Sequence, residues 1–192
     1  MATFGKLTDG SGSSSSGANR KRVSQATPGS NGTVTAGTIR MWRDSGSAPV
    51  KMVIYADSTG NPGALLAVSD EISLIATAEG DVNFTFSGAN QISVVGSTPY
   101  WIGYHNGTLT GGSFVSISSD STASGHRNDT DTYSDGTSDP YGTPTATSGI
   151  IDAYITYTEG GGATDVFFEN KYGIEGGMKA ATAAGMNGVL VT

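Results

Sequence analysis

Regular alternation of apolar and polar residues is the feature that most constrains how this chain can fold. In "VKMVIYADSTGNPGALLAVSDEISL", residues 50–74, the two types alternate, a turn-forming run interrupts them, and the alternation resumes. Side chains of a β-strand point to opposite faces with a period of two, so the pattern predicts two half-buried strands. Gly60 and Gly63 allow unusual backbone angles and Pro62 is a rigid corner, which together predict a turn between the strands.

The first of these two strands has a predicted inward face. Val50, Met52, Ile54 and Ala56 share the face that we expect to be buried, and the residues between them take the opposite face. Alternation of this kind is typical of an antiparallel sheet with one face against the core and one face in water.

The same period continues along residues 20–158 and predicts eight or nine short strands separated by turns. The composition also favours strands over helices, because 29 residues are glycine and only 14% are charged. Evenly spaced strands without helices predict an all-β fold, an antiparallel β-sandwich that is jelly-roll-like.

Both ends of the chain differ from this central part. Residues 1–19 form a predicted N-terminal arm and flexible linker, since "TDGSGSSSSGAN" has almost no apolar surface to bury. The residues before this linker, "TFGKL", are either a short strand or an arm. Residues 20–158 are the predicted sandwich. Residues 159–192 form a predicted extended tail that starts with three glycines and carries apolar residues, a combination suited to docking on another surface.

A long polar stretch, residues 118–149, interrupts the predicted strands. Loops of this length inside a compact domain are usually functional or disordered. Four of its five aspartates, Asp129, Asp131, Asp135 and Asp139, resemble the alternating oxygen ligands of some calcium loops, but the distal glutamate of an EF-hand is missing. We therefore expect ordinary aspartate-rich turns and no cofactor or metal, with calcium as the alternative.

No catalytic motif occurs in the sequence. Cysteine is absent, and the two histidines, His105 and His126, are not in a metal-binding spacing. The serine-rich segments contain no nucleophile elbow of the form G-x-S-x-G. We expect a protein that is not an enzyme.

Net charge and hydropathy argue against two classes of binding partner, nucleic acids and membranes. A net charge of −7 does not favour nucleic acid. No run approaches the ~20 apolar residues of a membrane span, and the first residues lack a secretory signal, so we expect synthesis in a cytoplasm and no membrane partner. Trp101 and His105 occupy the face of their predicted strand opposite the apolar one, where they either pack under a loop or stack on a sugar.

Four blocks of sequence, in this order, resemble a β-sandwich module of phage and prophage structural proteins. They are "VIYADSTGNPGALLAVSDEISL", "PYWIGYH", "DTYSDGTSDPYGTPT" and "AYITYT", and "NRKRVSQAT" is similar to the opening strand of the module. The resemblance covers residues 3–158 and excludes the tail. A short copy with a linker and an apolar tail is most similar to a capsid decoration, or cement, protein.

This resemblance implies a virion structural protein on the outer capsid surface. Its expected partner is the major capsid protein, and a homo-oligomer, with a trimer favoured, is also expected. The residues expected to bind the partner are Arg20, Arg22, Phe167, Phe168 and Tyr172. The alternative is a glycan-binding adhesion module of a tail fibre or cell-surface protein, which would use Tyr133 and Tyr141.

Overall fold

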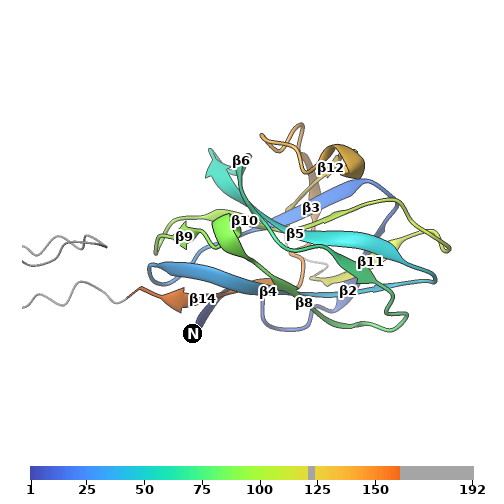
Figure 1. The fold of residues 1–192 in the computed structure, drawn as a ribbon, viewed down its shortest axis with the longest axis horizontal. Helices are drawn as coiled ribbons and strands as arrows, with labels where there is room; N and C mark the ends of the chain where they lie inside the picture. The colour runs from blue at the N-terminus through green and yellow to red at the C-terminus, as the bar shows by residue number, and fades with distance from the viewer. Residues whose placement is uncertain (121–123, 161–192) are drawn as a thin grey trace, which may run out of the picture. The chain divides into compact units, whose positions relative to one another are not determined.

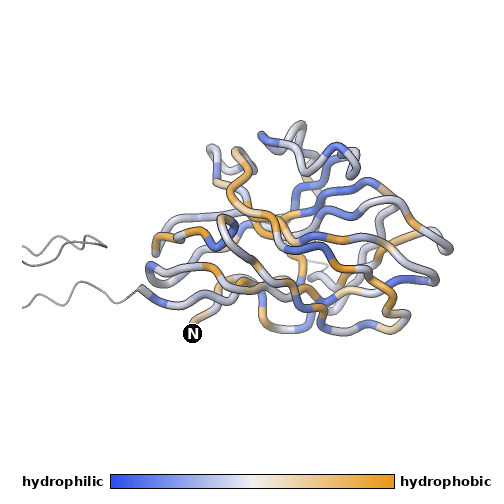
Figure 2. Tube along the Cα trace, viewed as in Figure 1, coloured by the Kyte–Doolittle hydropathy of each residue, from blue (hydrophilic) through white to orange (hydrophobic). Residues whose placement is uncertain are grey.

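Two antiparallel sheets stack face to face in the computed structural model of the chain, which describes residues 1–120 and 124–160 (Figure 1). The predicted all-β sandwich is therefore confirmed. Figure 2 shows hydrophobic and hydrophilic stretches interspersed along the sandwich.

Sheet A contains seven strands. Its hydrogen-bonded order is β1 (Ala2–Gly5), β14 (Ala153–Glu159), β4 (Gly32–Arg43), β11 (Val115–Ser119) and β2 (Gly12–Ser16), with β8 (Gly80–Thr85) and β9 (Ser93–Val94) also paired to β4. The long strand β4 thus lies at the centre of this sheet, and β1 lies at an edge next to β14.

Sheet B also contains seven strands. Its order is β13 (Thr145–Ser148), β12 (Ser124–Thr130), β3 (Arg20–Ala26), β10 (Tyr100–Asn106), β5 (Ala48–Ser58) and β6 (Asn61–Val68), with β7 (Ile72–Leu74) paired to β5. Two short 3₁₀ turns, η1 (Gly88–Asn90) and η2 (Tyr133–Asp135), lie in the connecting loops.

The connections make the sandwich jelly-roll-like. The pairs β5–β6 and β12–β13 form hairpins within sheet B, whereas β3 to β4, β4 to β5, β10 to β11, β11 to β12 and β13 to β14 each cross from one sheet to the other. Strands adjacent in the chain are therefore mostly not adjacent in a sheet, and the core is closed by contacts between distant segments.

The main core lies between the sheets, and it includes the predicted inward face of β5. Val50, Met52 and Ile54 are fully buried there, and Ala56 is half-buried near the end of the strand. The opposite face of β5 is not in water, however, because Val53 and Tyr55 are fully buried in a second apolar cluster on the outer face of sheet B. A long loop covers that face.

The expectation of a free N-terminal arm and linker is wrong. Residues 2–5 pair with β14 as strand β1, and the Gly/Ser segment pairs with β11 as strand β2. Phe4 is only 3% exposed and joins the main core. Serine buries little apolar surface, but an edge strand also gains backbone hydrogen bonds, which do not depend on side-chain type.

The other predicted boundary lies close to the end of β14 at Glu159. Met1–Gly160 form one compact unit. The predicted docking residues Phe167, Phe168 and Tyr172 lie outside the described residues.

Candidate functional site

The most distinctive surface of the sandwich is a loop, residues 131–144, that covers the outer face of sheet B. Beneath it lies the second apolar cluster, formed by Val23, Val53, Tyr55, Trp101 and Tyr141. The ring of Tyr141, contributed by the loop, packs edge-on against Tyr55 with 5.0 Å between centroids. The loop is therefore anchored by an aromatic residue that enters the protein rather than facing solvent.

A buried lysine holds the loop from below. Lys21 on β3 is fully buried, and its Nζ lies 3.1 Å from Oδ2 of Asp131. The same ammonium donates to the Tyr141 carbonyl at 2.5 Å and to the Ser138 hydroxyl, and it lies 4.5 Å from the centre of the Tyr141 ring. A buried charge is costly unless it is paired and hydrogen-bonded, and here the loop supplies the carboxylate, carbonyl and hydroxyl that bind the ammonium.

His105 on β10 is the second anchor of the loop. Its Nε2 lies 3.0 Å from the Asp131 carbonyl oxygen, which assigns the ring proton to Nε2, and Nδ1 accepts from the Thr137 hydroxyl at 3.1 Å. Burial lowers the pKa of His105, against the smaller raising effect of Asp131. Burial alone would raise the pKa of Asp131, yet hydrogen bonds from the Ser138 amide and Lys21 lower it. The cluster is thus a neutral histidine beside an ion pair.

The two tyrosines of the glycan alternative lie in different environments. Tyr141 is fully buried, and its hydroxyl donates to the Arg127 carbonyl at 3.0 Å, so its ring is not accessible to a sugar. Tyr133 is half-buried, with its hydroxyl donating to Glu71 at 2.8 Å and its ring 4.8 Å from that of His105. The prediction of a Tyr141 contact to glycan is therefore not compatible with this structure, whereas Tyr133 keeps part of its ring at the surface.

Trp101 packs beneath other side chains, which decides between the two alternatives given for it. It is 2% exposed because the Arg127 guanidinium lies over the ring, 5.1 Å from its centre. The indole Nε1 donates to Asp57 at 2.8 Å, and Gln25 donates to the same carboxylate oxygen. Burial raises the pKa of Asp57, but the Gly60 amide, Trp101 and Gln25 lower it by a larger amount together.

The two arginines predicted to bind a partner lie on β3. Arg22 spans the space between the sheets and donates to the Ser14 hydroxyl and the Ser15 carbonyl, both at 2.7 Å. Arg20 is half-buried at the start of the strand, opposite Thr130 and Asn106. Arg22 is therefore used to attach β2 to the sandwich.

The aspartates of the polar stretch each have a separate partner. Asp131 binds Lys21, Asp139 accepts from the Leu65 amide at 2.9 Å, and Asp129 accepts from the Thr143 amide at 3.2 Å. Within residues 1–120 and 124–160, no group of three or more His, Asp or Glu side chains is arranged to hold a metal ion.

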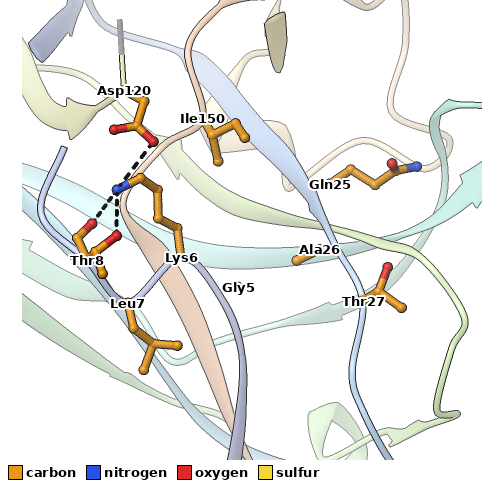
Figure 3. Close-up of a pocket in the computed structure, with 9 residues that line it drawn as sticks. All are labelled: Gly5, Lys6, Leu7, Thr8, Gln25, Ala26, Thr27, Asp120 and Ile150. Carbon is orange, nitrogen blue, oxygen red and sulfur yellow. Dashed lines mark hydrogen bonds and ion pairs between the residues drawn. The ribbon is translucent and has the colours of Figure 1, made fainter. Parts of the chain in front are cut away.

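A groove of about 500 Å³ lies at the side of the sandwich (Figure 3). One wall is the segment from Gly5 to Thr8, the other is Gln25–Thr27 at the end of β3, and Asp120 and Ile150 close one end. Lys6 points along the groove and lies 2.9 Å from Asp152 Oδ1 and 3.5 Å from Asp120 Oδ2. Sequence reasoning missed this site because Lys6 lay in a segment interpreted as an arm.

No protein-family model matches the chain, and no curated protein is significantly similar to it in sequence. In the part of the chain that the structure describes, no helix is both long and apolar enough to cross a membrane.

Proposed function

We propose that this chain is a virion structural protein that decorates and stabilises a phage capsid by non-catalytic protein–protein binding. Its partner would be the major capsid protein, its place the outer capsid surface, and its state a homo-oligomer, with a trimer favoured. Residues 159–192, with Phe167, Phe168 and Tyr172, would reach across neighbouring capsid subunits and fill apolar grooves between them.

One observation carries the proposal: three of the four blocks that resemble the phage module pack together in space. The first block supplies β5 and β6, the second supplies β10, and the third is the loop over sheet B. Tyr55, Trp101 and Tyr141, one from each block, meet in the second apolar cluster. Residues that recur together in the sequence pattern of a module are expected to form one structural unit, and these do.

The chemistry of the buried charged groups also supports binding over catalysis. Lys21, His105 and Asp131 join the loop to the sheet, and Arg43 on β4 is fully buried while donating to the carbonyls of Ser45 and Gly111. Each of these groups fixes a loop at the surface. A rigid surface loses little conformational entropy on association, which suits a protein whose task is adhesion.

Attachment to capsids tests the proposal. The full chain and a version ending at Gly160 would be mixed with undecorated capsids and sedimented through a density gradient. We expect the full chain to co-sediment at saturating, stoichiometric occupancy, and the shortened chain to remain at the top. Equal occupancy by the shortened chain would refute the role of the tail, and absence of binding by either chain would refute decoration.

Glycan binding remains the second candidate because Tyr133 lies at the surface beside Glu71 and Lys51. The Lys51 ammonium lies 4.9 Å from the centre of the Tyr133 ring. A half-exposed aromatic ring beside polar side chains is a common element of sugar sites. Saturable, sugar-specific binding of the full chain on a glycan array, lost in Tyr133→Ala, would favour this candidate over capsid decoration.

A further inference from the structure

Within the described residues, the edge of β1 that faces away from β14 is not paired with another strand. Lys6 donates its amide to the Ala153 carbonyl at 2.8 Å, so the Gly5 carbonyl, on the same trans peptide, points away from β14. By the alternation of an antiparallel pair, the amide and carbonyl of Thr3 point the same way. Thr3 and Gly5 are exposed, and among the described residues β1 pairs with β14 alone.

Two of the other sheet edges, β2 and β6, are protected in ways that β1 is not. Strand β2 lies on the same side of sheet A, where the Ser15 carbonyl already accepts a hydrogen bond from Arg22. Strand β6 pairs with β5 through two register irregularities, and bulged edges resist pairing with another chain. Strand β1 is regularly paired and carries no charged residue from Ala2 to Gly5.

The residues that line the groove beside β1 favour apolar and basic side chains in a ligand. Leu7 is 59% exposed on one wall, Ala26 lies on the other wall, and Ile150 supplies apolar surface at the end that Asp120 closes (Figure 3). At the end of the groove two carboxylates, Asp120 and Asp152, share the single ammonium of Lys6, which leaves a net charge of −1 for the three groups. The Asp120 side chain is 38% exposed and can receive a further cation.

We propose that this groove binds an extended peptide segment of a partner protein, with alternating apolar and basic side chains, by strand addition to β1. The backbone of the segment pairs with Thr3 and Gly5, an apolar side chain contacts Leu7 and Ile150, and a lysine or arginine reaches Asp120. Strand addition obtains affinity from main-chain hydrogen bonds and specificity from alternate side chains. The residues that line this groove all belong to the unit Met1–Gly160, and the inference does not depend on the identity of the capsid partner.

Binding of a defined probe tests this inference. The probe is a fluorescein-labelled heptapeptide of alternating valine and lysine, titrated with the full chain and followed by fluorescence anisotropy. We expect saturable binding, and affinity at least about tenfold lower when glutamate replaces lysine in the probe. Asp120→Asn should reduce this difference between the two probes.

Position 3 supplies a matched pair of variants. Thr3→Pro removes the outward amide and obstructs an added strand, whereas Thr3→Val keeps the amide and the branched side chain. Proline is tolerated on an edge strand when the missing amide faces solvent, so both variants are expected to fold, and only Thr3→Pro should lose probe binding.

Hydrogen exchange of the unmodified chain gives a readout that does not depend on any variant. The probe should slow exchange of the Thr3 and Gly5 amides. Protection that appears only at other strand edges, or equal binding of the lysine and glutamate probes, would overturn the proposal. Protection of these amides that rises with protein concentration in the absence of probe would also overturn it, in favour of pairing between two copies of the chain.

Discussion

Lys21 binds the loop that covers the outer face of sheet B, so this one side chain helps to keep that face buried. Lys21 is the middle residue of the basic run "RKR", and the structure buries it completely. Its partner, Asp131, is remote in the sequence and comes from a stretch without apolar periodicity. No local pattern connects the two, because the pairing depends on how the loop after β12 returns over sheet B.

Substituting Lys21 by methionine should destabilise the sandwich by about 3 kcal/mol. The variant keeps the length of the side chain but leaves the half-buried Asp131 carboxylate without its cation. The control is Lys51→Met, since the Lys51–Glu71 pair is exposed and should contribute less than about 1 kcal/mol. Urea unfolding of both variants measures the difference, and equal losses would mean that Lys21 is not a structural anchor.

His105 should make the protein less stable as the pH falls below the ordinary histidine pKa of 6.5. Because burial lowers the pKa of His105 in the folded state, the unfolded chain binds the proton more readily. Stability is therefore complete above the ordinary histidine pKa of 6.5 and falls as the pH drops below it, by up to about 1.4 kcal/mol per pH unit for each such group. The side chains of Asp131, Lys21 and Lys51 surround the ring and act on this titration.

The check is urea unfolding at several pH values for the unmodified chain and for His105→Gln. Glutamine can replace both hydrogen bonds but does not titrate, so the pH slope should decrease. It should not vanish, because burial also lowers the pKa of His126. Carboxylates with lowered pKa, such as Asp57, lose their contribution only nearer pH 4. An unchanged slope in the variant would contradict this assignment.

At the scale of the element, β5 separates what sequence reasoning could predict from what it could not. The alternation of Val50, Met52 and Ile54 correctly identified the inward face, since period two follows directly from strand geometry. The burial of Val53 and Tyr55 was missed, because it requires a polar loop to fold back over the sheet. Sequence pattern reports which face is more apolar, and it does not report what covers the other face.

What covers a sheet face also decides the environment of the two aromatic residues considered as sugar contacts, Tyr141 and Trp101. The glycan alternative requires a surface ring at Tyr141, but the loop turns this ring inward onto Tyr55. Trp101 is covered by Arg127, a residue from a different strand. Aromatic residues in polar loops are therefore ambiguous in sequence, and only the path of the loop decides whether they are anchors or contacts.

Truncating the inward face of β5 should open cavities in the main core. Ile54→Ala and Met52→Ala each remove fully buried atoms and are expected to cost about 2–4 kcal/mol. The exposed Leu66→Ala on the neighbouring strand β6 is the control and should change stability by less than about 1 kcal/mol. Thermal or urea unfolding distinguishes these values, and a change near zero at Ile54 would mean that the inward face is assigned wrongly.

At the scale of the whole molecule, the sandwich is closed by its first and last described strands. Ala2 lies opposite Tyr157, and Phe4 packs on the rings of Tyr100 and Tyr157, with centroids 6.0 and 5.7 Å away. Further along the N-terminal segment, the Ser16 hydroxyl lies 3.0 Å from that of Tyr104. The first strands are therefore part of the core, and contacts that connect distant segments form late and slow the folding of β proteins.

Deleting residues 1–19 should consequently abolish cooperative unfolding rather than simply shorten the chain. The deletion removes β1 and β2, exposes Tyr157 and Tyr104 to water, and leaves Arg22 without its partners on β2. Phe4→Ala, which removes one core side chain from the same segment, should cost about 3–5 kcal/mol and retain a cooperative transition. Leu7→Ser, at a position 59% exposed, should change stability by less than about 0.5 kcal/mol. If the deleted chain unfolds with the same midpoint and the same dependence on urea as the full chain, the N-terminal segment is a linker after all, because that dependence scales with the surface buried on folding.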